Sequence, residues 1–167
     1  SSARWTNSDG NLELSDGCYV YNNTVVINQP FTTAISMDAK NIFVYNNIFS
    51  STNGSGMGSQ NTVVRSNDTP FFMSNNFFEG TVDNRFLALD AMPQKGSPMF
   101  VDTGEYKYAY QLQEGSPAID NGSKVQGPIV AGAGMGVFKD IPAYPNVDFY
   151  GNPIDLSIES PNIGSNN

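Results

Sequence analysis

Acidic and amide side chains recur directly after short runs that read as strands. The runs cover residues 12–15, 34–37, 62–65 and 86–89, and the polar residues that follow them are Asp16, Asp38, Asn67, Asp68 and Asp90. If these runs stack in register as strands, their final residues lie about 5 Å apart along one edge. Carboxylates at that spacing can share Ca²⁺ or act as an acid/base pair. Asp and Asn also favour ordinary solvated turns, and that interpretation stays open.

Within each run, strand alternation decides which side chains could reach a ligand. It places Leu87 and Leu89 inward, and Ala88 and Asp90 outward. The same alternation turns Ser36 outward, beside the acidic residues at the strand ends. We therefore expect Asp38, Asp68 and Asp90 to be candidate ligands for Ca²⁺ on an outer face.

Composition narrows the chemistry that these residues could perform. The 167-residue chain has no His, which removes the commonest acid/base group and any His-based zinc site or catalytic triad. The single Cys18 cannot form an internal disulfide. A net charge of −8 argues against nucleic acid and anionic membranes as partners, and no apolar run approaches transmembrane length. Hard cations remain compatible with this charge.

Three segments, at residues 18–27, 42–51 and 71–80, share one pattern. Each has a short apolar run, an Asn-Asn pair and a second apolar run, with the pairs starting at Asn22, Asn46 and Asn75. A repeat of this length predicts a solenoid, in which each unit buries its face against its neighbours. Asn suits the bend because it tolerates the left-handed conformation, and stacked Asn side chains can bond in a ladder. A set of ordinary hairpins is the alternative.

These repeats resemble those of pectate-lyase-like right-handed parallel β-helix proteins. Residues 96–102, 110–122, 147–154 and 161–164 are similar to the tail that closes many secreted bacterial β-helix proteins. The resemblance implies an all-β, right-handed parallel β-helix of about four rungs over residues 1–90. Residues 91–167 would then form a loop-rich C-terminal capping segment. The first rung would leave the N-terminal end of the solenoid open, and we expect that end to be covered. The cover would be further rungs before Ser1, Trp5 and its neighbours, or another subunit.

The same resemblance implies a secreted or surface-exposed protein that binds or cleaves an extracellular polysaccharide. In lyases of this family Ca²⁺ neutralises a uronate carboxylate while Arg or Lys removes the proton. Arg65 and Lys40 are then the candidate catalytic bases, and Ser36, Asn67 and Arg85 the candidate substrate-binding residues. No catalytic motif of the family matches these positions, and the tail occurs in proteins of many activities. A non-catalytic structural or adhesion module is therefore the alternative function.

Overall fold

The structure is a computed structural model. It describes residues 4–6, 9, 12–27, 39–51, 71–80, 82, 84–104, 109–123, 147–155 and 157–165. The elements are β1 (Arg4–Thr6), β2 (Leu12–Tyr21), β3 (Thr24–Ile27), β4 (Ala39–Tyr45), β5 (Ile48–Ser51), β6 (Phe71–Ser74), β7 (Phe77–Glu79), α1 (Asn84–Leu87) and β8 (Gln94–Lys95). Strands predominate among the described residues, with one four-residue helix, which is consistent with the predicted all-β class. No helix among these elements is both long and apolar enough to cross a membrane.

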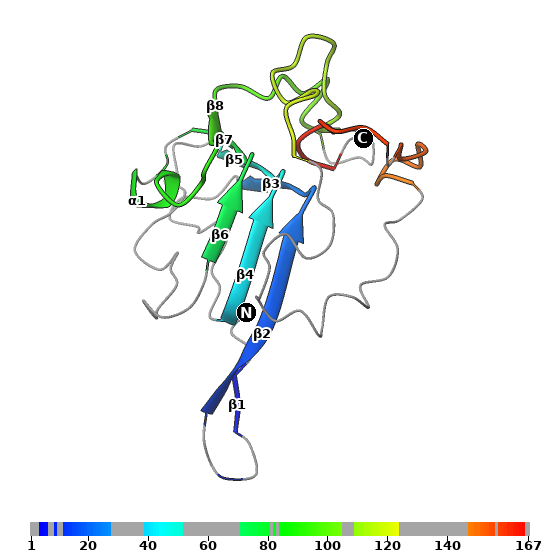
Figure 1. Cartoon of the computed structure of the whole chain (residues 1–167). Coiled ribbons are helices and arrows are strands. Elements are labelled where there is room, and N and C mark those ends of the chain that lie inside the picture. Colours follow the sequence, from blue (N-terminus) through cyan, green and yellow to red (C-terminus); the bar gives the residue numbers. More distant parts are fainter. Residues whose placement is uncertain are drawn as a thin grey trace.

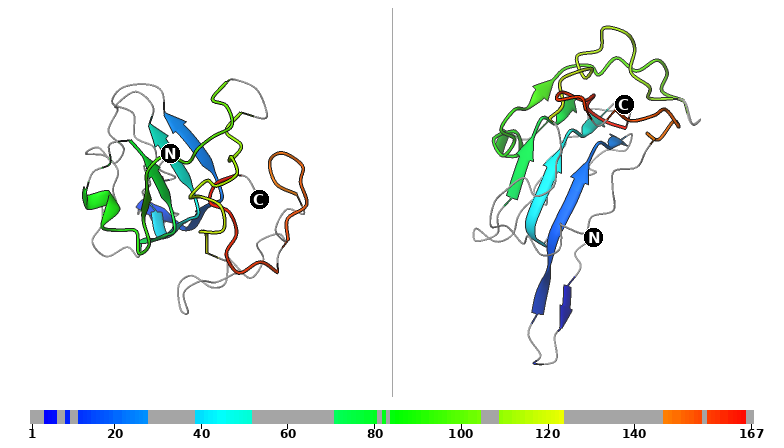
Figure 2. Two further views of the ribbon diagram at one scale, coloured as in Figure 1. Left: turned by 90° about the horizontal axis from the view of Figure 1, so that it is seen from above. Right: turned by 45° about the vertical axis from the view of Figure 1, so that its right-hand side comes forward.

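The strands form two sheets, ordered β1-β2-β4-β6 and β3-β5-β7-β8. All pairs are parallel except β1 with β2, and the chain passes from one sheet to the other at each Asn-Asn pair. Figures 1 and 2 show β2, β4 and β6 side by side, with β1 and the start of β2 projecting away from the other strands. Equivalent halves of the three sequence repeats therefore lie next to each other.

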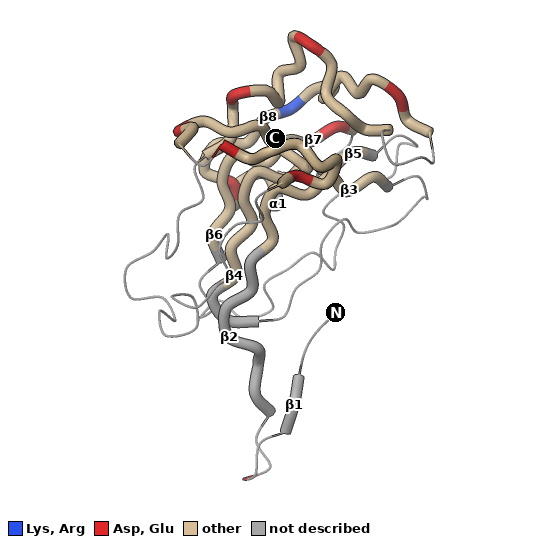
Figure 3. The backbone as a smooth tube through the Cα atoms, turned by 90° about the vertical axis from the view of Figure 1, so that its right-hand side faces the viewer, with Lys and Arg blue, Asp and Glu red and all other residues tan. Residues whose placement is uncertain are grey.

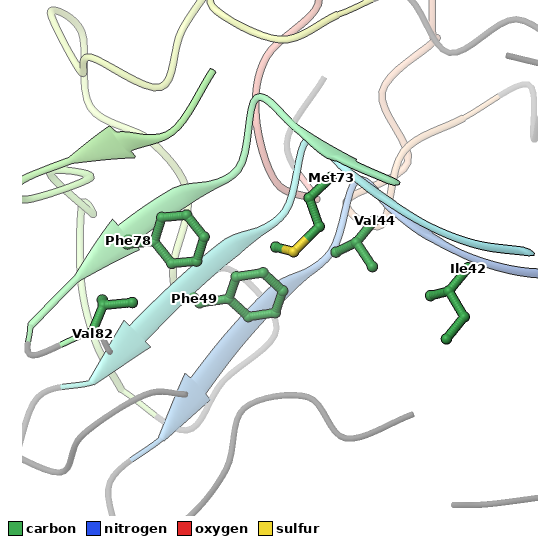
Figure 4. Close-up of a cluster of buried hydrophobic side chains, with 6 residues drawn as sticks. All are labelled: Ile42, Val44, Phe49, Met73, Phe78 and Val82. Carbon is green, nitrogen blue, oxygen red and sulfur yellow. The ribbon is translucent and has the colours of Figure 1, made fainter. Parts of the chain in front are cut away.

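The main core lies between the two sheets. It contains Ile42 and Val44 of β4, Phe49 of β5, Met73 of β6 and Phe78 of β7, all buried, together with Val82 (Figure 4). Phe49 and Phe78 stack in neighbouring strands with ring centroids 5.6 Å apart. In-register parallel pairing places equivalent side chains above one another, so apolar residues at matching repeat positions form continuous columns.

A second apolar cluster joins the C-terminal region to the sheets. Ile48 and Phe77 alternate with Phe49 and Phe78, so they face away from the main core. They are covered by Leu112, Ala118 and Ile163, which are distant in sequence. β8 lies beyond residue 90 and pairs with β7, so the second sheet continues past that position. The boundary between rungs and capping segment near residue 90 stays a prediction.

The strand predicted at residues 86–89 is wrong. Asn84–Leu87 is a short helix, in which the Ala88 amide donates to the Asn84 carbonyl at 3.0 Å, and a turn follows it. The segment holds Arg, Phe, Leu and Ala and no β-branched residue, a composition that favours a helical turn. Leu87 packs against the core as predicted, whereas Leu89, expected inside, is 42% exposed.

Candidate functional site: an asparagine ladder ending on Asp90

Each Asn-Asn pair makes the bend between the two sheets. The first residues of the pairs, Asn22, Asn46 and Asn75, have φ of 54°, 55° and 55°. These values lie in the left-handed region, where Asn is tolerated better than most residues because its short side chain bonds locally. The prediction that Asn takes the left-handed conformation at these bends is therefore confirmed.

The second residues of the pairs form a one-way ladder. The Asn23 amide nitrogen Nδ2 donates to Asn47 Oδ1 at 3.0 Å, and Asn47 Nδ2 donates to Asn76 Oδ1 at 2.9 Å. The same two oxygens also accept the backbone amides of Asn23 and Asn47, at 3.1 and 3.0 Å. Asn47 and Asn76 are completely buried. Each buried side-chain amide is thereby bonded to the repeat before it and to the repeat after it.

Asp90 ends the ladder. Its Oδ2 accepts Asn76 Nδ2 at 2.7 Å and the Asn76 backbone amide at 3.1 Å, while Oδ1 accepts the Met92 amide at 2.9 Å. The residue is 6% exposed and forms a parallel bridge with Met73. Burial raises the pKa of the Asp90 carboxyl above its ordinary value, although its hydrogen bonds from Asn76 and Met92 act in the opposite direction. Asp90 thus occupies the place that Asn occupies in the preceding repeats.

Asp90 also influences a tyrosine on the first sheet. Burial raises the pKa of the Tyr45 hydroxyl, and the nearby Asp90 carboxylate raises it further because two negative charges repel. Tyr45 is the residue before the second bend and is half-buried. The pair places a phenol and a carboxyl group near one another at the corner of the two sheets.

The C-terminal segment binds the outer side of the bends. The Asn46 side chain donates to the Ser123 carbonyl at 2.6 Å and accepts the Ser123 amide at 2.8 Å. The Asn46 carbonyl accepts the Gly164 amide at 2.7 Å, and Asn75 Nδ2 donates to the Asn121 carbonyl at 3.1 Å. In the second and third pairs, the first Asn therefore bonds to the C-terminal segment while the second forms the ladder; in the first pair, Asn22 Oδ1 is buried without a hydrogen-bond partner.

Two glycines permit this close approach. A Cβ at Gly164, where φ is +94°, would lie 2.7 Å from Ile48 Cδ1 and 2.8 Å from Thr24 Oγ1. At Gly122 a Cβ would lie 2.6 Å from the Pro161 carbonyl oxygen. All three distances are shorter than a Cβ normally keeps, so a side chain at Gly164 would push the segment away from Ile48 and Thr24, and one at Gly122 would push it away from Pro161.

The predicted acidic site is only partly within the described residues. Five of its residues lie outside them: Ser36, Asp38, Arg65, Asn67 and Asp68. The backbones of Lys40 and Arg85 are described, in β4 and α1. The register pairs Asp16 with Lys40, so the Cα neighbour of Asp16 is a basic residue and not the acidic one that we expected.

Asp90 also differs from the prediction that the acidic residues at the strand ends line one outer edge. The sequence placed it on an outer face, but the structure buries it because the predicted strand before it is a helix and turn. The role of Asp90 in the ladder was missed. Its chemistry could have suggested this role, because Asp accepts the same two amide hydrogens as Asn. The sequence around Asp90 did not suggest it, because Asp90 is not flanked by Asn as the ladder residues of the earlier repeats are.

In the part of the chain that the structure describes, no group of three His, Cys, Asp or Glu residues could hold a metal ion. Figure 3 shows acidic positions spread along the described C-terminal segment. The Ca²⁺ site stays a prediction that depends on Asp38 and Asp68. Comparison with known proteins gave no matching family model and no significant match among curated proteins.

Proposed function

We propose that the chain is part of a right-handed parallel β-helix protein, secreted or surface-exposed, in which these residues form stacked rungs. The observation that carries this proposal is the amide ladder, which runs from Asn23 through Asn47 and Asn76 to Asp90. Such a ladder needs repeats stacked in the same orientation, and the parallel registers of β2, β4 and β6 agree with that requirement. The handedness follows from the sequence resemblance.

Within such a protein, we assign the C-terminal segment the function of a clasp that ties successive rungs together. It bonds the second bend at Asn46 and the third at Asn75, and Ser165 donates to Thr24 after the first bend at 3.2 Å. One segment therefore contacts three repeats that are otherwise held only by their neighbours. This supports a structural module as the primary function of the described residues.

Truncation tests the clasp. Removing residues 147–167 takes away Ile163 and Gly164, which exposes Ile48 and Phe77 and leaves the Asn46 carbonyl without the Gly164 amide. We expect a lower Tm, binding of a hydrophobic dye and faster proteolysis at the bends. Unchanged Tm and dye binding in the truncated chain would contradict a clasp.

A second candidate, binding or cleavage of an extracellular polysaccharide, is favoured by one surface feature. Phe149 is 65% exposed and its ring meets that of Tyr150 edge to face at 5.3 Å. Tyr150 is buried, and its hydroxyl donates to the Ala109 carbonyl at 3.0 Å. The Asp148 side chain further fixes the turn by accepting the Tyr150 amide at 2.9 Å. An exposed aromatic ring on a fixed turn is suited to stacking on a sugar ring.

If the chain is a calcium-assisted lyase, Asp38 and Asp68 hold Ca²⁺ and Arg65 or Lys40 removes the proton. Calorimetric titration with Ca²⁺ and a panel of acidic polysaccharides, with absorbance monitoring of unsaturated products, tests this. Loss of Ca²⁺ binding in an Asp38→Ala/Asp68→Ala double variant would support the metal site. Loss of polysaccharide binding in Phe149→Ala, without change in Tm, would support the aromatic surface. Absence of binding and product in the unaltered chain would leave only the structural function.

A further inference from the structure

The clasp contains the pair Asn121–Gly122, which can react with itself. The backbone amide nitrogen of the residue after an Asn attacks the side-chain carbon Cγ, and glycine at that position hinders the attack least. A bond forms between that nitrogen and Cγ, the bond from Cγ to Nδ2 breaks, and ammonia leaves a closed succinimide ring. Water then opens the ring at either carbonyl. The product is Asp or isoaspartate, in which the main chain runs through the former side chain.

In the structure, both reacting groups are held in hydrogen bonds. The Gly122 amide donates to the Pro161 carbonyl at 2.7 Å, and Gly122 is buried. The leaving nitrogen, Asn121 Nδ2, donates to the Pro117 and Ile119 carbonyls at 3.1 and 3.0 Å. A bonded backbone amide gives up its proton only when the bond opens. The attack therefore requires local opening of the clasp.

Opening at this point separates the two halves of the clasp from one another. The Ile163 amide donates to the Ala118 carbonyl at 2.8 Å, and the Asp120 amide donates to Asn162 Oδ1 at 3.1 Å. Asn121 itself is exposed. Its protection consequently depends on the hydrogen bonds between the halves and not on exclusion of water from the side chain.

The isoaspartate product does not fit the closed clasp. It lengthens the main chain by one carbon next to Gly122, where a Cβ would already lie 2.6 Å from the Pro161 carbonyl oxygen and 3.2 Å from Asn46 Oδ1. A shifted backbone would also move Ser123, whose amide and carbonyl bond to the Asn46 side chain at 2.8 and 2.6 Å. Asn46 is completely buried, so loss of these bonds would leave a buried amide unpaired.

We propose that Asn121–Gly122 is a self-modification site that the closed clasp protects, and that its conversion to isoaspartate prevents the clasp from closing again. The reaction needs only water and releases ammonia, so it makes an opening of the clasp irreversible. The proposal rests on the clasp function and adds a chemical step to it.

The rate of deamidation tests the protection. The chain contains Asn-Gly-Ser twice, at residues 53–55 and 121–123, so Asn53→Gln is the background for every variant. Peptide mass spectrometry after incubation in mildly alkaline buffer measures the reaction at Asn121. We expect it to be at least about tenfold slower in the folded chain than in a free peptide of residues 116–126, because several hydrogen bonds must open together.

A matched pair of variants links the rate to the clasp. Gly164→Ala places a Cβ against Ile48 and Thr24 and should accelerate deamidation at Asn121. Gly151→Ala is the control, because Gly151 also has positive φ but its Cβ would contact nothing, and it should leave the rate unchanged.

The stability of the product tests the irreversibility. The isoaspartate form is made in denaturant, separated by chromatography and refolded. Asn121→Asp is its control, since it carries the same added charge without the extra main-chain carbon. We expect the isoaspartate form to have the lower Tm and to bind more hydrophobic dye.

Equal deamidation rates in the folded chain and the free peptide, or equal Tm for the isoaspartate form and Asn121→Asp, would overturn the proposal. A lower Tm in Gly164→Ala with no change in the rate at Asn121 would overturn it while the clasp stands. Truncation of residues 147–167 without effect on Tm would instead refute the clasp itself.

Discussion

Replacing Asn47 by Leu tests whether the ladder is a buried hydrogen-bond network that holds the repeats together. The side chain is completely buried and makes four hydrogen bonds: two from Nδ2, to Asn76 Oδ1 and the Val20 carbonyl, and two to Oδ1, from the amide and side chain of Asn23. Leu has a similar size but makes none of them. At about 1 kcal/mol for each bond, Asn47→Leu should lower the free energy of unfolding by about 4 kcal/mol.

A loss of that size is a large part of the total stability of an ordinary domain, which is about 5–15 kcal/mol. For a chain of this length it corresponds to a decrease in Tm of about 8–16 °C. Guanidinium unfolding followed by circular dichroism measures the free energy, and the slope of the transition shows whether it remains cooperative.

Asn23→Leu is the matched control, because it makes the same chemical change at the exposed end of the ladder. It removes the bonds of Nδ2 to Asn47 and Tyr21 but leaves the backbone amide of residue 23 bonded to Asn47. Since water can replace bonds at an exposed site, we expect a loss of about 1 kcal/mol. Equal losses in the two variants would refute the argument that burial makes the inner ladder bonds important.

Three further comparisons test other parts of the structure. Gly164→Ala should lower Tm more than Gly151→Ala, because both have strongly positive φ but only the first would place a Cβ against the sheet; differential scanning calorimetry measures this. For Asp90, a folded-state pKa raised by burial means that its contribution to stability is present below about pH 4 and is lost as the pH rises through the raised value. The Tm of Asp90→Asn relative to the unaltered chain should therefore increase from pH 4 to 7, and a pH-independent difference would contradict a buried, ionisable Asp90. Tyr150→Phe should cost about 1 kcal/mol in chemical denaturation, because its hydroxyl is buried and bonded, whereas Tyr110→Phe, with its more exposed hydroxyl bond, should cost less.

The bends and their ladder could be predicted because the information is local. Three Asn-Asn pairs between apolar runs require a left-handed residue followed by an inward amide, and both features depend on the pair itself. The helix at residues 84–87 was missed because strand assignment there relied on continuing the repeat. At that position the local helix propensity outweighs the repeat pattern, and the repeat itself is shorter. The paired residues Phe77 and Gln94 are 17 residues apart, whereas the equivalent pair Thr24 and Ile48 is 24 residues apart.

The C-terminal contacts and the position of Asp90 were not predictable from local pattern. Ser123 bonds to Asn46 across 77 residues, and no periodicity marks either residue as the partner of the other. Asp90 was expected on an outer face because alternation was counted along a strand that does not form. Most of the proposed acidic site lies outside the described residues, so Asp38, Arg65 and Asp68 stay predictions from sequence.

The Asn-Asn bend is the one part of the repeat whose length is constant, and this determines where the chain can accept inserted residues. The separation between paired strands is 24, 29 and then 17 residues, but in the three Asn-Asn bends two residues always separate the sheets' strands. The differences in length between the repeats therefore lie outside the bends. An insertion between β5 and β6, where the repeat is longer than the one before it, should disturb the strand register less than an insertion within a bend. A single residue inserted between Asn46 and Asn47 would instead reverse the faces of β5, so that Phe49 points out and Ile48 points in.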